Sequence, residues 1–292
     1  MNLSIIIVAF KSGHILEKLI LSIPKQHEII IIENSLDLEI KKKFEKFENI
    51  KVIIPEENLG YGRSFNLGLQ KSKNNFTLFL SPDISIPNEC FENINKIIKK
   101  FDDFTILAPT YIDESIHRNY QIKNKELLKN KIVDNFKLIE VDEIDFAMAI
   151  INKSNLNQKK LMDENFFLYF ESTDACLNLR KNNKKIYVIE NVKFQHYGTK
   201  SSDPKFMIDI NISRNWHFCW SKFYLLKKHN GYLHALRKTI PNFVRALKMC
   251  FISIIKIDVD NFKIHKASIS GLIASYFLKK SKFRPLANKE KN

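Results

Sequence analysis

Residues 58–68 read NLGYGRSFNLG, and further along the chain residues 78–83 read LFLSPD. The first stretch is a glycine-rich turn that carries Arg63 and leads into a predicted helix. The second is an apolar strand that ends on one carboxylate, Asp83. A glycine turn at a helix start suits a diphosphate, and the carboxylate suits its divalent cation. Each stretch alone is common, but their order and spacing together predict a site for a sugar nucleotide.

Around these stretches the first hundred residues alternate apolar runs with amphipathic segments. This alternation is typical of β-α-β units around a mostly parallel sheet, and uninterrupted apolar strands are expected where helices cover both faces. The predicted fold class is therefore α/β, with a Rossmann-like first half. Strands are predicted over 3–10, 28–32, 51–54 and 76–80, and helices over 14–22, over 64–71 and from Pro87 onward.

The pattern weakens in the middle of the chain. Residues 107–143 are predicted to form a polar, variable loop or a short hairpin, in which we identify no chemistry. Order returns with strands predicted over 144–151 and 186–194, and with an aromatic run over 162–180 that leads into a helix. We expect a main domain over residues 1–212.

Residues 213–292 differ in composition, because aromatic and apolar side chains are mixed there with lysine and arginine. Segments of this kind can lie in the interface of an anionic membrane. They can equally form a helical cap that covers the sheet. Both alternatives stay open, and peripheral contact with an anionic membrane is one partner that the sequence predicts.

The chain is strongly basic, with 47 Lys and Arg against 32 Asp and Glu and a net charge of +15. This balance suggests an anionic partner such as a nucleic acid, a phospholipid surface or a phosphorylated substrate. The abundance of lysine, isoleucine and asparagine throughout the chain explains the charge equally well. Because no recognisable nucleic-acid motif is present, we expect no nucleic-acid partner.

The sequence also bears on the compartment. Four scattered cysteines form no Cys-x-x-Cys pair, which argues against a disulfide scaffold and a structural zinc site and favours a reducing compartment. The N-terminus lacks the pattern of a signal peptide, and no apolar run approaches the roughly 18 to 20 residues of a membrane span. We therefore expect a cytoplasmic protein, either free or at the inner face of the plasma membrane.

Several polar residues follow predicted strands at their carboxyl ends, where open α/β sheets bind ligands. Glu33 can accept hydrogen bonds from a base or a ribose, or simply initiate a turn. Asp83 can hold Mg²⁺ or Mn²⁺ between two phosphates, or cap the turn that follows; the glycine turn before it favours the metal. His196 can complete that metal site or be structural. Lys200 and Ser201 can close over phosphate oxygens.

Acidic residues also follow the aromatic run. If a helix begins near Ser172, Glu171 lies at its N-terminal end, where a partly desolvated carboxylate can act as a general base. The competing interpretation makes Glu171, Ser172 and Asp174 ordinary helix-start residues. The residues alone leave these two interpretations equal. The sequence contains no His-Glu-x-x-His motif, which argues against a zinc hydrolase, and no P-loop motif, which excludes P-loop NTPase chemistry.

Together these segments resemble the family 2 glycosyltransferases, in particular a bacterial rhamnosyltransferase-like branch, over roughly residues 3–230. Residues 58–68 are similar to the family's Asn-x-Gly-x-Gly-x-x-x-Asn-x-Gly signature. Residues 80–83 resemble the Leu-Asn-Pro-Asp form of its metal motif, and 166–180 resemble its acceptor-side segment. Residues 33–35 match an Asp-Asn-Ser element with Glu in place of Asp, and 196–201 match a late histidine element.

The resemblance implies a GT-A fold and an inverting transfer of a sugar, assisted by Mg²⁺ or Mn²⁺. The donor would be a nucleoside-diphosphate sugar, and the acceptor a hydroxyl of a lipid-linked or saccharide molecule in cell-surface polysaccharide synthesis. Asp83 and His196 would hold the metal diphosphate. The residues expected to bind the nucleotide donor are Ala9, Phe10, Glu33, Asn58, Gly60, Gly62 and Arg63.

The chain departs from the family pattern at two positions. Ser81 stands first in the metal motif, so Asp83 must supply the carboxylate alone. Ser172 stands where the family has its usual base, and a serine cannot accept a proton at neutral pH without a base of its own. Either Glu171, which we favour, or Asp174 takes that role, or catalysis is impaired. The alternative function is a non-catalytic sugar-nucleotide-binding or membrane-scaffold protein.

Overall fold

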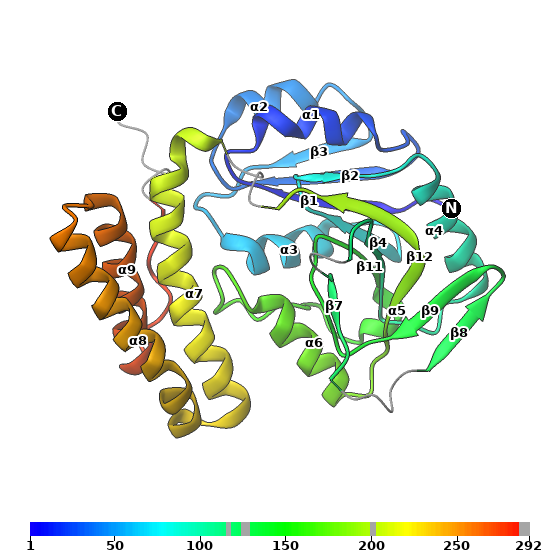
Figure 1. Ribbon diagram of the computed structural model, residues 1–292. Coiled ribbons are helices and arrows are strands. Elements are labelled where there is room, and N and C mark those ends of the chain that lie inside the picture. The colour runs from blue at the N-terminus through cyan, green and yellow to red at the C-terminus, as the bar shows by residue number, and fades with distance from the viewer. Residues whose placement is uncertain (115–117, 124–128, 199–202, 286–292) are drawn as a thin grey trace. The chain divides into compact units, whose positions relative to one another are not determined.

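The computed structural model of the chain describes residues 1–114, 118–123, 129–198 and 203–285 (Figure 1). The chain divides into two compact units. The first comprises Met1–Glu57, Arg63–Met162 and Ser172–Ser202, and the second comprises Asn58–Gly62, Asp163–Glu171 and Asp203–Asn292.

The first unit is built on a mixed β-sheet with the strand order β3-β2-β1-β4-β11-β6-β12-β9-β8. Strand β1 pairs in parallel with both β2 and β4, β11 runs antiparallel to β4 and β6, and β12 runs parallel to β6. A further short strand, β5, pairs with the end of β12. The bounds of these strands are β1 Ser4–Ala9, β2 Glu28–Glu33, β3 Ile50–Ile53, β4 Phe76–Leu80, β5 Ile84–Ser85, β6 Ile106–Tyr111, β8 Asn130–Val133, β9 Phe136–Glu140, β11 Met148–Asn152 and β12 Ile186–His196.

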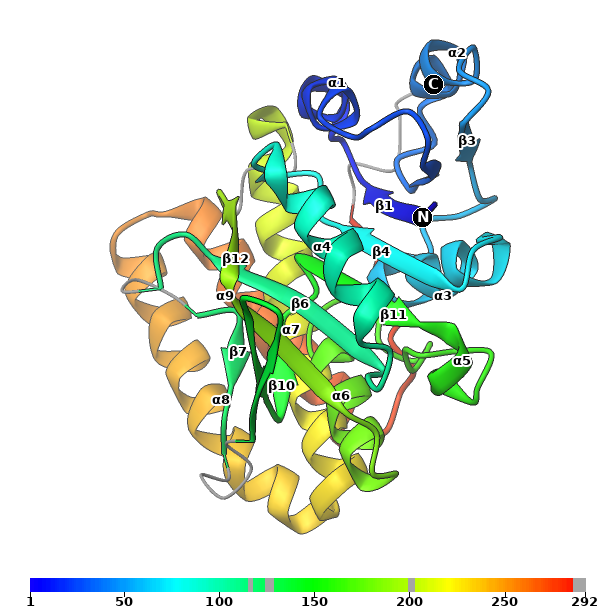
Figure 2. The same ribbon diagram turned by 90° about the vertical axis from the view of Figure 1, so that its right-hand side faces the viewer.

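Helices cover both faces of this sheet, as the continuous apolar strands predict. On one face Ile5 and Ile7 belong to a core that includes buried residues of α1 (Gly13–Leu21), α2 (Leu38–Phe44) and α4 (Glu89–Lys100). On the other face Ile6 packs against Gly68 of α3 (Gly60–Lys71). Figure 2 shows α4 in front of the strands that it covers. Two further helices are α5 (Lys153–Leu156) and α6 (Glu171–Lys181).

The middle of the chain is more ordered than the sequence predicts. The expected loop over 107–143 contains most of strand β6, which lies inside the sheet, so that part of the prediction is wrong; its hairpin alternative is confirmed by β8 and β9. The strand expected over 144–151 is interrupted. Its start belongs to β10 (Glu143–Ile144), which pairs with β7 (Tyr120–Gln121), and its remainder to β11. Helix α3 begins at Gly60 and not at residue 64, and α2 was not predicted at all.

The topology gathers several chain segments at one edge of the sheet. Because β1, β2, β4, β6 and β12 all point the same way, their carboxyl ends share that edge. Successive strands leave β1 in opposite directions, with β2 and β3 on one side and β4 on the other. Open α/β sheets bind ligands at such a reversal of strand order. This edge is therefore the first place to look for a site.

The second unit contains three long helices, α7 (Met207–Asn230), α8 (Tyr232–Ile255) and α9 (Val259–Tyr276), after a short 3₁₀ turn at Pro204–Phe206. They pack against one another. Most of the basic, aromatic region that the sequence marks over residues 213–292 lies in these helices. Among the residues that the structure describes, no helix combines the length and the hydropathy that crossing a bilayer requires.

Candidate active site

Glu33 is a buried carboxylate at the end of β2, directly beside Ala9 at the end of β1. Its Oε1 atom accepts hydrogen bonds from the backbone N–H of Ser35, at 2.6 Å, and from the Ser35 hydroxyl. Its Oε2 atom is buried and accepts no hydrogen bond from any described residue. Burial raises the pKa of Glu33 to about 7, against the opposing effect of the Ser35 hydrogen bonds. The end of β2 thus presents an acceptor that a ligand can satisfy.

The turn after β1 is linked to this carboxylate through Ser35. The N–H of Phe10 donates to Ser12 Oγ and that of Lys11 to Ser35 Oγ, each at 3.2 Å. Lys11 has a φ of 51°, which is uncommon for a residue with a side chain. Ala9 and Phe10, which the sequence predicts to contact the nucleotide, therefore lie at the sheet edge next to Glu33.

The glycine signature shows clear structural roles. Asn58 caps the start of α3, because its Oδ1 accepts the N–H of Gly60 at 2.9 Å. Gly60 has a φ of +75°, and a Cβ there would lie 2.3 Å from the carbonyl oxygen of Phe167. Asn66 holds the backbone of Met162 through both ends of its amide, at 2.9 and 3.0 Å. These residues shape the turn whether or not a ligand binds beside it.

Arg63 lies in the first turn of α3, next to the buried Gly62. Its Nη1 atom is 3.0 Å from Glu57 Oε1, and both side chains are exposed. An exposed ion pair of this kind is weak, so Arg63 can exchange Glu57 for a phosphate at little cost.

Asp83 lies beyond the end of β4, at the sheet edge predicted to bind the ligand. Its Oδ1 atom accepts a hydrogen bond from the Ser81 hydroxyl at 2.6 Å and lies 3.3 Å from Nε2 of His196. The antiparallel pairing of β5 with the last two residues of β12 brings His196 to this position. The structure therefore places the two predicted metal ligands together. Ser81, which departs from the pattern of the metal motif, holds Asp83 through its hydroxyl.

The pair is electrostatically coupled. Burial opposes ionisation of Asp83, but the hydrogen bonds from His196 and Ser81 outweigh it and lower the pKa of the carboxyl group. Burial also lowers the pKa of His196, and there the hydrogen bond and charge of Asp83 outweigh it and raise the pKa. Each partner thus favours the charged form of the other.

Two residues that the sequence did not single out complete this network. The Tyr111 hydroxyl donates to Asp145 Oδ2 at 2.5 Å and lies 2.8 Å from Nδ1 of His196. Tyr111 ends β6 and Asp145 precedes β11, so both reach the same sheet edge. The apolar run at residues 106–108 could have indicated β6, but nothing in the sequence indicates that the side chains of Tyr111, Asp145 and His196 meet.

A divalent cation can be tested against this donor set. Within the described parts of the chain, no group of three or more His, Cys, Asp and Glu side chains is placed to hold a metal ion. Mg²⁺ commonly binds one or two carboxylates and completes its shell with phosphates and water, so no larger cluster is needed. Asp83 fits this role. His196 fits as a second ligand once its Nε2 atom gives up the contact with Asp83.

Glu171 is the first residue of α6 and is buried. Its Oε2 atom has no hydrogen-bond partner among the described residues, and burial raises its pKa to about 7. The preceding Tyr169 and Phe170 have φ values of 70° and 66°, a left-handed conformation that is costly for side-chain-bearing residues. Two consecutive strained residues followed by a buried carboxylate with an open acceptor are typical of a functional site.

The other predicted acceptor-side residues differ from Glu171. Asp174 is fully buried and its Oδ2 accepts a hydrogen bond from Asn178 Nδ2, one turn further along α6, at 3.1 Å. Lys200 and Ser201 lie outside the described residues. Glu171 is therefore the stronger candidate base on geometry.

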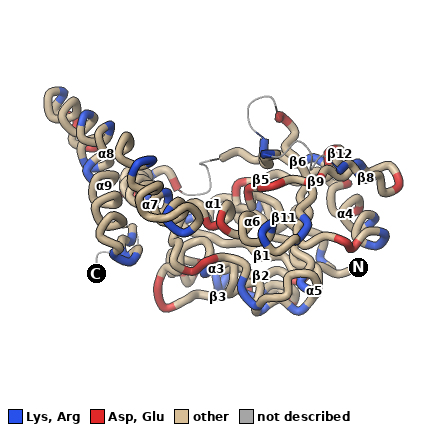
Figure 3. Tube along the Cα trace, turned by 90° about the horizontal axis from the view of Figure 1, so that it is seen from below, with Lys and Arg blue, Asp and Glu red and all other residues tan. Residues whose placement is uncertain are grey.

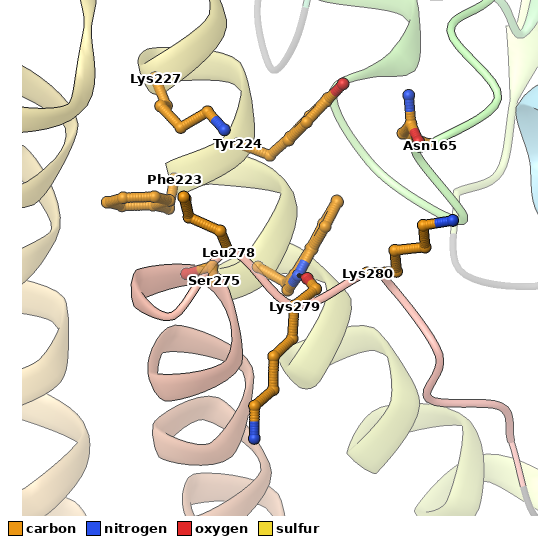
Figure 4. A pocket seen from close by; sticks show the side chains of 9 residues that line it. Asn165, Phe223, Tyr224, Lys227, Ser275, Leu278, Lys279 and Lys280 are labelled. Atoms are coloured by element: carbon orange, nitrogen blue, oxygen red, sulfur yellow. Dashed lines mark hydrogen bonds between the residues drawn. The ribbon is translucent and has the colours of Figure 1, made fainter.

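The second unit contains a pocket beside α7 and the end of α9 (Figure 4). Trp220 and Tyr224 stack with their ring centroids 5.0 Å apart, and the side chains of Lys227 and Lys280 also line it. Aromatic rings and ammonium groups suit a ligand that is partly apolar and partly anionic. The sequence marked this region as aromatic and basic but did not predict a pocket.

The chain is similar in sequence to known glycosyltransferases. The family model described as glycosyl transferase family 2 matches residues 4–158. The low-salt glycan biosynthesis hexosyltransferase Agl10 of Haloferax volcanii is 26% identical over 197 residues, which cover 63% of this chain and 64% of Agl10. The dTDP-rhamnosyl transferase RfbF of Shigella flexneri is 22% identical over 232 residues, 74% of this chain and 76% of RfbF.

Two solved structures share the fold. The mannosyltransferase PcManGT from Pyrobaculum calidifontis, in complex with GDP-Man and Mn²⁺, has a TM-score of 0.55 at 9% identity, over 95% of this chain and 88% of PcManGT. S. aureus TarS 1–349 in complex with UDP has a TM-score of 0.50 at 16% identity, over 97% of this chain and 94% of TarS 1–349. At these identities the likeness concerns the fold alone.

Proposed function

We propose that this chain, which belongs to glycosyl transferase family 2, moves a sugar from a nucleoside-diphosphate sugar to a hydroxyl of a lipid-linked or saccharide acceptor. The family model matches more than half of the chain. The observation that carries the proposal is the placing of Glu33 and Asp83 at one sheet edge, on either side of β1, where the strand order reverses. The similarity to a hexosyltransferase and a dTDP-rhamnosyl transferase, and the GDP-Man bound to PcManGT, support a nucleotide-sugar donor.

The nucleoside would bind at the ends of β1 and β2. The open Oε2 atom of Glu33 would accept a hydrogen bond from the base or ribose. Because this bond would be buried, it would be electrostatically stronger than one exposed to water. The backbone at Ala9 and Phe10 would line the same place. Arg63 and the glycine turn would approach the diphosphate, after Arg63 leaves Glu57.

The diphosphate would be held near Asp83 and His196, with Lys200 and Ser201 as further phosphate contacts. Ser81 and His196 keep Asp83 ionised, ready to hold a divalent cation. Mg²⁺ or Mn²⁺ bound there would supply Lewis-acid stabilisation of the charge that develops on the leaving diphosphate. The Mn²⁺ in PcManGT supports this assignment.

Glu171 would act as the general base, with Asp174 as the second candidate. Its raised pKa makes its carboxylate a stronger base than an ordinary glutamate, while a sizeable fraction remains ionised near neutral pH. The acceptor oxygen, deprotonated by Glu171, would attack the anomeric carbon on the face opposite the diphosphate. The new C–O bond would form as the bond to the diphosphate breaks, so the configuration at the anomeric carbon would invert. Glu171 would in this way compensate for Ser172.

A second candidate function rests on that same serine. If Glu171 does not replace the usual base, the chain would bind sugar nucleotides or scaffold a membrane assembly without turnover.

We also propose a catalytic domain over residues 1–212, a basic helical region over 213–292, and a cytoplasmic role in cell-surface polysaccharide synthesis. All four cysteines are free thiols, which supports a reducing compartment.

The proposal is tested by thermal melting of the full chain with UDP, GDP, dTDP or CDP, with and without Mn²⁺. A ligand that binds the native state raises its melting temperature. We expect a metal-dependent rise with one nucleotide that is lost in Asp83→Ala and kept in Asp134→Ala, an exposed aspartate paired with Lys100. No rise with any nucleotide would overturn the proposal. Binding without turnover of the matching sugar nucleotide would support the second candidate.

A further inference from the structure

Helix α8 is packed in the reverse of the usual sense. In most helices of water-soluble domains the large apolar side chains face the core and small or polar ones face water. On α8 the buried side chains are small: Ala235, Thr239, Ala246, Cys250 and Ser253. Seven of its large apolar side chains are exposed, whereas Leu236, Phe243, Met249 and Ile252 are half-buried: the exposed ones are Leu233, Ile240, Val244, Leu247, Phe251, Ile254 and Ile255.

These exposed side chains form one continuous stripe along the helix. From Ile240 to Ile254 they recur every three or four residues, and Ile255 follows Phe251 by four, which places them on one helix face. The exposed fractions reach 79% for Leu233 and 64% for Phe251, so the stripe is not covered by α7 or α9. We call Leu233, Ile240, Val244, Leu247, Phe251, Ile254 and Ile255 the α8 stripe.

The helices hold together without using the stripe. Ala267, Gly271 and Ser275 recur every fourth residue on the buried side of α9. A Cβ on Gly271 would lie 2.3 Å from the carbonyl oxygen of Trp216, so the backbones of α9 and α7 are in direct contact. Small residues at this spacing allow close packing of helices and are typical of helices that associate in lipid. Packing of the three helices therefore does not require the α8 stripe.

Charge indicates what the stripe contacts. Helix α8 carries four exposed cations, Arg237, Lys238, Arg245 and Lys248, and residues 210–257 contain no Asp or Glu (Figure 3). Among the described residues none of the four cations pairs with a carboxylate. By helical spacing, Arg237 and Lys248 border the stripe. The helix thus combines an apolar face with an uncompensated cationic flank.

We propose that α8 lies in the surface of an anionic phospholipid membrane, with its stripe in the acyl boundary and its cations among the headgroup phosphates. A second copy of the chain fits less well, because a two-fold contact through α8 would bring like charges together without an acid to pair them. A nucleic acid would leave the apolar stripe exposed to water. The inference does not rest on the proposed transfer reaction.

The test is co-sedimentation of the full chain with vesicles of phosphatidylcholine alone or mixed with phosphatidylglycerol. We expect binding to the anionic vesicles that weakens with salt. The double variant Leu247→Ser/Phe251→Ser should lower the partition coefficient by about tenfold or more, because two large apolar side chains no longer enter the acyl region. Both positions are exposed, so the fold should be unaffected; a thermal melt checks this.

Matched controls separate this face from the rest of the surface. Leu21→Ser/Ile132→Ser changes two apolar side chains of the first unit that are 78% and 77% exposed, and should bind vesicles as the wild type does. Arg245→Gln/Lys248→Gln should weaken binding to anionic vesicles. Lys18→Gln/Lys51→Gln, which removes two exposed lysines of the first unit, should weaken it less.

Three outcomes would overturn the inference. One is the absence of binding to anionic vesicles, and another is equal binding by the stripe variant and its control. The third is a stable dimer that Leu247→Ser/Phe251→Ser converts to a monomer in analytical ultracentrifugation, which would assign the stripe to a second copy. The metal-dependent rise in melting temperature with a nucleotide would be unchanged in each of these three outcomes. Failure of the membrane proposal is therefore distinguishable from failure of the proposed function.

Discussion

Asp83 Oδ1 lies 3.3 Å from Nε2 of His196, and each residue favours the charged form of the other. The contact depends on the pairing of β5 with the end of β12, which no local sequence pattern encodes. Tyr111 stands on the opposite side of the imidazole, at Nδ1, and is itself bonded to Asp145. Both ring nitrogens of His196 are thus engaged by oxygen atoms at the proposed diphosphate site.

Asp83→Asn should lower the pKa of His196. In the metal-free wild type the hydrogen bond and charge of Asp83 outweigh the effect of burial, so the imidazole titrates above its ordinary value of 6.5. The variant removes the charge and leaves burial as the dominant effect, so the pKa should fall below that of the wild type. NMR titration of the imidazole resonances measures both values. An unchanged pKa would show that the contact does not form in solution.

Glu171→Gln should abolish the rise of the transfer rate with pH. The base must be ionised to accept a proton, so turnover in the wild type should increase through a pKa of about 7 and then level off. Loss of a general base typically costs about 10²–10⁴-fold in rate, and the residual rate should no longer follow this titration. The measurement is sugar transfer at saturating donor across this pH range.

Asp174→Asn is the comparison for that experiment. Asp174 accepts a hydrogen bond from Asn178, an interaction that an asparagine oxygen preserves. We expect the ascending limb of the pH profile to persist in this variant. If the limb disappears there and persists in Glu171→Gln, the two residues exchange roles and Asp174 is the base.

The predicted fold was accurate where apolar strands are continuous. Strands β1 to β4 could be predicted because strands covered on both faces are apolar throughout, and α4 by its apolar stripe, whereas α2 between them was missed. The family and GT-A fold predictions are confirmed. Strand β6 was missed because its residues were grouped with the polar stretch that follows them, and Pro109 is itself unusual in an interior strand. In the structure Pro109 lies opposite Ile189, where the register of β12 shifts, and beyond the residues that pair with β11. A proline is tolerated there because the ladder is already irregular.

The candidate site was only partly predictable. Glu33, Asp83 and Glu171 follow or precede elements that the local pattern reveals, so their positions at strand and helix ends could be inferred. The network of Tyr111 and Asp145 could not, because it depends on the order of β6, β11 and β12 in the sheet. The nucleotide, metal and base assignments remain predictions, as do the domain boundaries.

Glu33→Gln should make the protein more stable at alkaline pH. The folded pKa of about 7 lies above the ordinary value of 4.5, so the folded state binds an extra proton between these values. Its stabilising contribution is complete below the lower value and is lost as pH rises through about 7. The uncharged amide removes that loss, and its oxygen can still accept from Ser35.

Chemical denaturation at about pH 5 and about pH 8 measures this effect. The wild type should lose stability relative to Glu33→Gln between the two values. Glu39→Gln, an exposed glutamate paired with Lys42, is the control and should leave the pH dependence unchanged. Parallel curves for wild type and Glu33→Gln would mean that Glu33 is ionised without cost, and that its burial is not maintained in solution.

Gly60→Ala should destabilise the fold even without any ligand. The backbone at Gly60 has a φ of +75°, and the added Cβ would meet the Phe167 carbonyl oxygen at 2.3 Å, so the turn or the 167 backbone must move. We expect a loss of about 1–3 kcal/mol in the free energy of unfolding. Gly13→Ala is the matched control, because its Cβ would make only ordinary contacts with Ile40, 3.6 Å away at the nearest.

The control should be neutral or more stable by about 0.4–1 kcal/mol, since alanine restricts the unfolded chain without straining the folded one. Urea denaturation of the two variants and the wild type, in the absence of nucleotide, gives the comparison directly. If both glycines prove equally replaceable, the strained entry into α3 is not formed in the free protein. The glycine signature would then be needed for the ligand alone, and Gly60→Ala should reduce nucleotide-dependent stabilisation without changing the stability of the free chain.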